Sequence, residues 1–415
     1  MWGIDRIGSG QLAAARKRLR NGSCAVLTHS ASVDRKGRTT WRVLEELGVI
    51  PKVVFSPEHG LFGVAQAEEP VDSTNLRTAA PEASEPSDEA PALRVVSLYG
   101  NSRESLSPRD EDLEGIDTLV IDIVDVGSRY YTYVWTALLA ARAAAAKGIH
   151  TLVLDRPNPL GGDPGLCEGK SQSAGYLSFV GLEPIAIRHG LSVGELLAHY
   201  FARDGHALGP DGALSVVACW GWERLKTAKA WGRPFIPPSP NMPTLETALL
   251  YPGGCLVEGT NLSEGRGTAF PFRVVGAPFL DGEKLAQQMA EAHLPGLLVR
   301  PAAFKPTFEK HRGQVCHGVM LHLTDARTFR PVTTYLTLLT LARAQAPEAF
   351  QFRTEVYEFE AAIPAIDLLC GSSAVREAMT SGASPNEVVE LLAPVDPEHL
   401  ELLGGIEALF ERARA

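Results

Sequence analysis

The chain has 415 residues, which is more than one hydrophobic core usually accommodates, so we expect two domains. Hydrophobic residues make up 45% of the chain and charged residues 21%, the proportions of an ordinary globular protein. The formal net charge of −10 argues against nucleic acid as the main partner, because binding to phosphates requires a basic surface.

The first half of the chain predicts alternating strands and helices. Helical patterns lie at residues 11–20, 39–47 and 133–147, and a further helix follows Ser192, where Glu195 completes a capping-box spacing. Apolar, β-branched runs predict buried strands at residues 24–28, 53–55, 94–98, 118–123, 151–155 and 184–187. Such strands separated by helices imply a parallel sheet covered on both faces, and hence an α/β fold.

Residues 67–92 break this pattern. They are rich in Glu, Pro, Ala and Ser and have no periodicity. Segments of this composition bury too little apolar surface to order themselves, so we expect a solvated, mobile loop here.

The second half predicts a smaller α/β domain with a helical tail. Prolines stiffen a connector at residues 237–243, and a glycine-punctuated loop follows at 251–268. We place the domains at residues 1–240 and 241–415, with loop 251–268 in a ligand cleft between them. The alternative for this loop is a polar hinge. The remaining pattern predicts helices at 282–293 and 332–346, strands at 297–300 and 318–323, and helices from residue 374 onward.

Polar and ionisable residues follow the carboxyl ends of several predicted strands. These ends meet at one edge of a parallel sheet, where α/β proteins bind ligands. Glu58, in Ser56-Pro57-Glu58-His59-Gly60, is the first candidate for chemistry; the alternative is that Glu58 caps a helix and His59 fills a turn. The whole predicted rim consists of His29, Glu58, His59, Asp122, Asp125, Arg156, Asn158, Arg188 and His189.

Motifs for cofactors and metals are missing from the sequence. Gly8-Ser9-Gly10 follows no strand and lacks the third glycine of a dinucleotide fingerprint. No phosphate-binding loop and no Gly-x-Ser-x-Gly elbow occurs. The spacing of His311, Cys316, His317 and His322 fits no zinc pattern. We therefore expect neither a cofactor nor a metal.

Targeting signals are missing as well. No apolar run approaches the roughly 18 residues of a membrane span, and residues 1–20 contain no apolar core of signal-peptide length. The six cysteines are scattered and form no Cys-x-x-Cys pair, which favours reduced thiols. We expect a cytoplasmic protein, although a trimmed exported form would have the same sequence. The pattern gives no prediction of the oligomeric state.

Carboxylate chemistry is the reaction type that remains. Hydrolysis of a glycosidic bond needs an acid that protonates the leaving oxygen and a second group that attacks or stabilises the oxocarbenium-like centre. Glu58, with His59 beside it, is the candidate acid. The candidates for the second group are Asp125, Glu258 and Glu264, which the sequence does not rank.

Several motifs together resemble one family, the bacterial exo-acting β-N-acetylmuramidases. The resemblance runs from about residue 26 to the carboxyl end. It depends on motifs that occur in the order expected for the family: Phe55-Ser56-Pro57-Glu58-His59-Gly60, the segments at 122–127, 129–133 and 154–162, Arg188-His189-Gly190, Pro238-Ser239-Pro240-Asn241-Met242-Pro243, and the segment at 258–268.

This resemblance implies a Rossmann-like amino-terminal domain, a smaller carboxy-terminal domain and an active cleft between them. The implied reaction removes N-acetylmuramic acid from the non-reducing ends of peptidoglycan fragments, with Glu58 as the catalytic acid. The segment at 29–32 departs from the family pattern, as does the long acidic segment at 67–92. The alternative is a protein that binds or senses cell-wall sugars without catalysis.

The implied substrate predicts its own contacts. Muramic acid carries a lactyl carboxylate, which calls for an arginine; Arg266 is the first choice and Arg188 the second. The 2-acetamido group of the sugar would serve as nucleophile in a substrate-assisted mechanism. The other predicted substrate-binding residues are His189, Tyr131, Asn241, Asn261 and Glu258.

Overall fold

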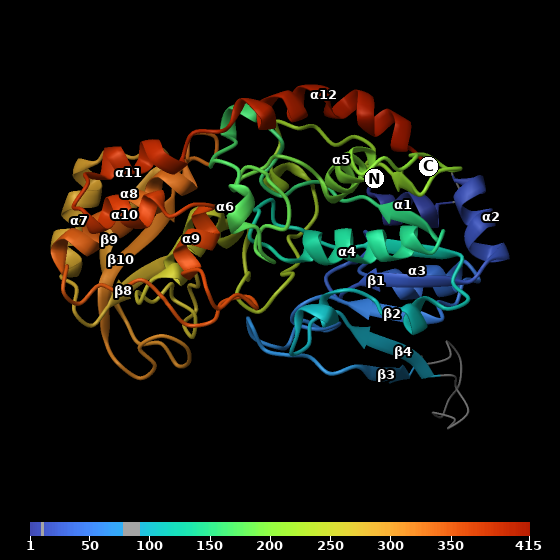
Figure 1. Cartoon of the computed structure of the whole chain (residues 1–415), viewed down its shortest axis with the longest axis horizontal. Coiled ribbons are helices and arrows are strands. Elements are labelled where there is room, and N and C mark those ends of the chain that lie inside the picture. Colours follow the sequence, from blue (N-terminus) through green and yellow to red (C-terminus); the bar gives the residue numbers. More distant parts are fainter. Residues whose placement is uncertain (10–11, 78–91) are drawn as a thin grey trace.

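The computed structural model describes residues 1–9, 12–77 and 92–415. Figure 1 shows two domains side by side, each built around its own sheet. One large hydrophobic cluster runs from the sheet of the first domain into the second, so the domains share part of their core.

Six parallel strands form the sheet of the amino-terminal domain, and an antiparallel strand lies at one edge. The strand order is β3-β4-β2-β1-β5-β6-β7, so the direction of winding reverses at β1. Ligands bind beside such a reversal, and β2, which leads to Glu58, is the neighbour of β1. The strands are β1 (Cys24–Thr28), β2 (Val53–Ser56), β3 (Thr74–Arg77), β4 (Ala92–Ser97), β5 (Thr118–Asp122), β6 (His150–Leu154) and β7 (Leu214–Val217). The predicted parallel sheet is confirmed.

Helices cover both faces of this sheet (Figure 1). Side chains of β1 alternate between two clusters: Val26 packs on one side and Leu27 on the other. Helices α1 (Gly3–Gly8), α2 (Ala13–Asn21) and α3 (Thr40–Glu46) cover the Val26 side, and α4 (Tyr133–Ala146) and α5 (Val193–Arg203) the Leu27 side. The predicted capping box of α5 is confirmed, because the Ser192 hydroxyl accepts a hydrogen bond from the Glu195 N–H and the Glu195 carboxylate accepts one from the Ser192 N–H.

The second domain contains a three-stranded antiparallel sheet in the order β8-β10-β9. Its strands are β8 (Val274–Ala277), β9 (Leu297–Phe304) and β10 (Cys316–Leu323). The helices are α6 (Leu245–Gly254), α7 (Gly282–Glu291), α8 (Pro331–Gln345), α9 (Ala365–Cys370), α10 (Ala374–Thr380), α11 (Pro385–Leu392) and α12 (Pro397–Ala413). Short 3₁₀ helices lie at Arg103–Leu106, Asp110–Leu113, Pro164–Leu166, Ala174–Tyr176, Ala228–Ala230 and Cys255–Gly259.

The tail helix α12 returns to the amino-terminal domain, where it packs on α5 and β7 (Figure 1). The Ala415 N–H donates to the Val216 carbonyl beside the edge of the sheet. The predicted boundary at residue 240 therefore leaves the last helix in contact with the first domain.

Two predicted stretches differ in the structure, and two strands were not predicted. Residues 184–187 form no strand; only Arg188 pairs there, in isolated bridges to Ser128 and Glu168. Part of the predicted loop at 67–92 is the edge strand β3, and residues 78–91 lie outside the described part of the chain. Strands β7 and β8, of four residues each, were not predicted.

The glycine-punctuated stretch 251–268 is largely helical at its start. Helix α6 continues through Pro252 to Gly254, and a 3₁₀ helix follows to Gly259. A Cβ atom on Gly253 would lie 2.0 Å from the carbonyl oxygen of Pro331 at the start of α8. These glycines therefore allow α6 and α8 to pack closely, whereas the sequence pattern indicated only a loop.

Two buried charges of the amino-terminal domain bind helix ends of the second domain. The Glu168 carboxylate accepts hydrogen bonds from the N–H groups of Val332 and Thr333 at 3.1 and 3.2 Å, at the start of α8. The Arg129 guanidinium donates to the Leu369 carbonyl at 2.6 Å, in the last turn of α9. Each charge has the sign that stabilises the helix end it contacts. These contacts, together with the shared hydrophobic core, hold the two domains against each other.

Replacement of Arg129 by methionine is expected to destabilise the protein by about 3 kcal/mol or more. Arg129 is fully buried, and its guanidinium also donates to the carbonyls of Lys170 and Ile185, at 2.7 and 2.9 Å. Methionine would leave these carbonyls and that of Leu369 buried without a donor. The free energy of unfolding in urea measures the effect.

Arg103 provides the matched control, because it also joins the domains, through an ion pair with Glu360, but is 54% exposed. Arg103→Met is expected to cost less than about 1 kcal/mol. Equal losses in the two variants would show that burial of Arg129 is not what makes its contacts important.

Candidate active site

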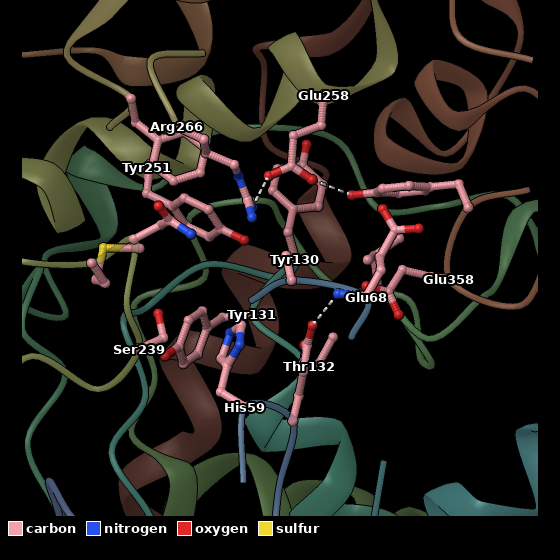
Figure 2. A pocket seen from close by; sticks show the side chains of 17 residues that line it. His59, Glu68, Tyr130, Tyr131, Thr132, Ser239, Tyr251, Glu258, Arg266 and Glu358 are labelled. Carbon is pink, nitrogen blue, oxygen red and sulfur yellow. Dashed lines mark hydrogen bonds and ion pairs between the residues drawn. The ribbon is translucent and has the colours of Figure 1, made fainter. Parts of the chain in front are cut away.

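A small cavity lies between the two domains at the end of β2 (Figure 2), and we call it the inner cavity. Its volume is about 40 Å³, which accommodates a few water molecules but not a sugar ring. Both domains contribute to its wall. The lining residues are Glu58, His59, Ala67, Glu68, Tyr130, Tyr131, Thr132, Val180, Ser239, Asn241, Met242, Tyr251, Glu258, Arg266, Phe272, Tyr357 and Glu358.

Glu58 enters this cavity because it directly follows β2 and Pro57, and it is only 5% exposed. One carboxylate oxygen accepts a hydrogen bond from the Thr132 hydroxyl at 2.6 Å, and the other accepts one from the Glu68 N–H at 3.2 Å. Neither donor is a cation, so these contacts orient the carboxyl without balancing a negative charge. The ring of His59 lies beside it, with Nδ1 2.9 Å from the Ala65 carbonyl oxygen.

Arg266 and Glu258 form an ion pair of 2.6 Å on the wall contributed by the second domain (Figure 2). The Tyr357 hydroxyl donates to the other oxygen of Glu258 at 2.8 Å. Glu264 lies outside the cavity lining, 3.4 Å from Arg266 and 3.0 Å from Lys310. Burial acts to raise the pKa of Glu264, but Lys310 and Arg266 lower it below its ordinary value. Glu264 therefore serves as a buried counter-ion to both cations.

Two further glutamates reach the cavity. Glu68 pairs with Arg353 through contacts of 2.9 and 3.1 Å. Glu358 accepts a hydrogen bond from the Tyr99 hydroxyl at 3.0 Å. Burial, followed by the charges of Glu58 and Glu68, raises the pKa of Glu358 well above its ordinary value. Four glutamates thus line the cavity, and among the described residues only Glu68 and Glu258 have a cation partner.

Backbone strain is concentrated around this cavity. Eight non-glycine residues of the described chain have positive φ, and four of them line it: His59, Glu68, Phe272 and Glu358, at 67°, 60°, 61° and 48°. Such conformations cost about 1–3 kcal/mol each and are kept where the surrounding structure holds them. The backbone is therefore strained at four positions of the wall, as is common at functional sites.

Groups that would bind sugar hydroxyls also lie here. The predicted residues Tyr131 and Asn241 both line the cavity. The stiff connector 237–243 brings Asn241 into place, and its amide donates to Gln66 at 2.9 Å. The ring of Tyr131 packs against Tyr251 of the second domain, with 6.1 Å between centroids.

Asp125 and His189 do not line the inner cavity. His189 Nδ1 accepts a hydrogen bond from the Leu191 N–H, which directs Nε2 toward Asp125 at 3.5 Å. Asp125 instead lines a separate, mostly apolar cavity that includes Trp2 and Trp231. The pair is buried within the amino-terminal domain, so the structure does not bring it to Glu58.

Arg188 and Asn261 are also outside the inner cavity. Arg188 is 3% exposed and donates to the Leu160 carbonyl at 3.0 Å. The side chain of Asn261 is hydrogen-bonded to the backbone of Ala349 and Gln351. Arg188 thus fixes a loop, whereas Asn261, besides its bonds to the backbone, lines a larger groove of the second domain.

The other residues of the predicted rim are bonded to each other or to nearby backbone groups. Asp122 forms a buried ion pair with Arg156, and Asn158 donates to the Leu191 carbonyl at 3.0 Å. The imidazole of His29 accepts from the Val124 N–H at 3.1 Å. Strand-end polarity was therefore a correct sign of a polar edge, but only Glu58 and His59 of this set reach the cavity.

Sequence reasoning missed Glu68, Thr132, Tyr251, Tyr357 and Glu358. Glu68 lies in the segment predicted as a solvated loop. Tyr357 and Glu358 belong to a stretch between α8 and α9 that follows no strand and contains no glycine signal. Only the contact between the domains makes them part of the site.

The described residues contain no group of three or more His, Cys, Asp or Glu side chains arranged to hold a metal ion. Nor is any helix in the described ranges long and apolar enough to cross a membrane.

Comparisons with known proteins match the whole of this architecture. The family profile for the amino-terminal domain of the exo-β-N-acetylmuramidase NamZ matches residues 24–246, and the profile for its carboxy-terminal domain matches residues 249–396. The peptidoglycan β-N-acetylmuramidase NamZ of Bacillus subtilis (strain 168) is 38% identical over 388 residues, which cover 93% of this chain and 86% of that protein.

Two crystal structures from Bacteroides fragilis NCTC 9343, both of DUF1343 family proteins, share the fold. One has a TM-score of 0.78 at 27% identity and the other a TM-score of 0.68 at 25% identity. In both cases the match covers 98% of this chain and 97% of the other. With both family profiles matched in order along the chain, this protein belongs to the NamZ family of exo-β-N-acetylmuramidases.

Proposed function

We propose that this protein is a glycoside hydrolase that releases N-acetylmuramic acid from the non-reducing ends of peptidoglycan fragments, with Glu58 as general acid. The observation that carries the proposal is the position of Glu58: a buried carboxyl in a cavity between the domains, facing the Arg266–Glu258 pair. Family membership supports the substrate class, because the B. subtilis relative is named as a peptidoglycan β-N-acetylmuramidase.

The proposed first step is proton transfer. Glu58 gives its proton to the glycosidic oxygen as the bond from that oxygen to the anomeric carbon breaks, and the electron pair stays with the leaving oxygen. Water later adds to the anomeric carbon, and its second proton returns to Glu58. The Thr132 hydroxyl and the Glu68 N–H keep the carboxyl in one orientation through this cycle.

Glu258 is our proposed second group. It lines the cavity, and its ion pair with Arg266 balances its negative charge there. It would stabilise the positive charge that develops at the anomeric carbon, either directly or by orienting the 2-acetamido group of the sugar. The other two candidates from the sequence, Asp125 and Glu264, do not line the cavity.

Replacement of Glu58 by glutamine is expected to reduce turnover by about 10²- to 10⁴-fold, because glutamine has no acidic proton to donate. The loss should be larger for a disaccharide that ends in N-acetylmuramic acid than for its 4-nitrophenyl glycoside, since nitrophenolate leaves with little help from an acid. Release of N-acetylmuramic acid and of nitrophenol, measured side by side, checks both parts.

The matched control is Glu69→Gln, a nearby glutamate that lines no part of the inner cavity and accepts a hydrogen bond from the Gln66 N–H. Its turnover should stay near that of the wild type. Rapid cleavage of the disaccharide by the Glu58 variant would contradict the assignment. Binding of N-acetylmuramic acid without any product from the wild type would instead favour a sugar-binding protein.

Replacement of Glu358 by glutamine is expected to stabilise the protein increasingly as pH rises. An unfolded glutamate loses its proton near pH 4.3. In the native state the pKa of Glu358 is raised, so Glu358 keeps its proton to higher pH. Wild-type stability therefore falls with rising pH in this window, by at most about 1.4 kcal/mol per pH unit from this residue. Glutamine has no such proton and still accepts from Tyr99.

The measurement is the difference in unfolding free energy between the variant and the wild type from about pH 4 to about pH 7. A difference that is constant with pH would show that Glu358 ionises like an ordinary glutamate.

A further inference from the structure

A larger groove adjoins the inner cavity on its outer side. It has a volume of about 520 Å³ and shares Ala67 and Glu68 with the inner cavity. The rest of its wall comes from the second domain and includes Arg353. Glu68 is thus part of the partition between a cavity too small for a sugar ring and an outer space that is large enough for one.

The partition is held by the ion pair between Glu68 and Arg353. Both guanidinium nitrogens that face Glu68 contact its carboxylate, at 2.9 and 3.1 Å. Arg353 is held from behind, because it also donates to the Val356 carbonyl at 3.0 Å and lies 4.9 Å from the centre of the Tyr357 ring. Arg353 is therefore a preorganised two-pronged receptor for a carboxylate.

Arg266, the residue that the sequence favoured for the lactyl carboxylate, has a different environment. Glu258 and Glu264 both contact it, and its side chain is only 9% exposed. A third carboxylate would meet the negative charge of both. Among the described residues Arg353 has one carboxylate partner, Glu68, whose side chain is 32% exposed and borders the open groove.

The ion pair of Glu68 is also more exposed than that of Glu258: the Arg353 and Glu68 side chains are 23% and 32% exposed, against 9% and 10% for Arg266 and Glu258. Burial raises the pKa of Glu68, with Arg353 acting in the opposite direction. A carboxylate that is partly desolvated in the pair regains hydration when it moves into the groove. Glu68 is, in addition, held at a strained positive φ of 60°.

We propose that Arg353 binds the lactyl carboxylate of the muramic acid ring, and that the substrate carboxylate takes the place that Glu68 occupies in the structure. The inference rests on the proposed function. The sugar ring then lies toward Glu58, and its lactyl branch points into the groove. Displacement of the Glu68 side chain, with its backbone N–H still bonded to Glu58, joins the two spaces and provides the volume that the inner cavity lacks. Arg353 thereby selects N-acetylmuramic acid over N-acetylglucosamine, which has no lactyl group.

The test compares three 4-nitrophenyl glycosides: the β-N-acetylmuramide, its lactyl methylamide and the β-N-acetylglucosaminide. Arg353→Gln is expected to lower kcat/KM for the muramide by about 10- to 100-fold, mainly through KM, as the loss of charged hydrogen bonds implies. The other two substrates lack the carboxylate and should change little. Arg353→Lys should restore part of the preference, since it keeps the charge without the two-pronged geometry.

The variant Glu68→Gln distinguishes two roles of Arg353: binding of the substrate carboxylate, and a purely structural ion pair with Glu68. If Glu68 competes with the substrate, its removal lowers KM for the muramide, whereas removal of Arg353 raises it. If the ion pair were purely structural, both variants would raise KM for the muramide. The control for loss of a positive charge is Arg327. Its side chain is 86% exposed, it pairs with Asp325, and it lines neither space.

The outcomes distinguish the two proposals. If the wild type releases no N-acetylmuramic acid, the proposed function is wrong. If the wild type is active and selective but the Arg353 variants keep the full preference for the free lactyl carboxylate, the assignment of Arg353 is wrong and the proposed function stands. Loss of the preference in an Arg266→Gln variant alone would place the receptor at Arg266 instead.

Discussion

The buried Arg129 guanidinium is the contact on which the site depends most. It donates to carbonyls of its own domain and to the last turn of α9 in the other domain, and it does so without exposure to water. Glu168 makes the complementary contact at the start of α8. The walls of the inner cavity come from different domains, so their spacing depends on these two charges. A change at either one would move Glu58 relative to Glu258 and Arg266.

Charge balance explains the character of the cavity. Arg266 and Arg353 each hold one of its glutamates, whereas Glu58 and Glu358 receive hydrogen bonds only from uncharged groups among the described residues. Burial, followed by the charges of Glu58 and Glu68, raises the pKa of Glu358, so the carboxyl of Glu358 keeps its proton more readily than an exposed glutamate does. The strained backbone at Glu68 and Glu358 holds these two carboxyl groups in the same cavity as Glu58, although carboxylates repel one another.

The local pattern of apolar residues predicted most helices and strands of the amino-terminal domain. The strand predicted at 24–28 has the same bounds in the structure, and the predicted helix at 133–147 differs by one residue. Prediction failed where neighbours in space decide the structure: at 184–187, where no strand partner lies alongside, and at 251–259, where close packing on α8 makes a glycine-rich stretch helical. Propensity is a weak prior, and tertiary contacts override it at such places.

Apolar periodicity and contiguous motifs are local properties, and for this reason they were enough to predict the parallel sheet, the position of Glu58 and His59 at the end of β2, and the family. Which polar residues share a cavity with Glu58 depends instead on how the two domains pack together. The tertiary structure removed Asp125, His189, Arg188 and Asn261 from that cavity, and it added Glu68 and Glu358. The physical reason is that the wall forms when two domains meet, and the side chains that meet there are up to 300 positions apart, as Glu58 and Glu358 are. No spacing along the chain encodes that distance.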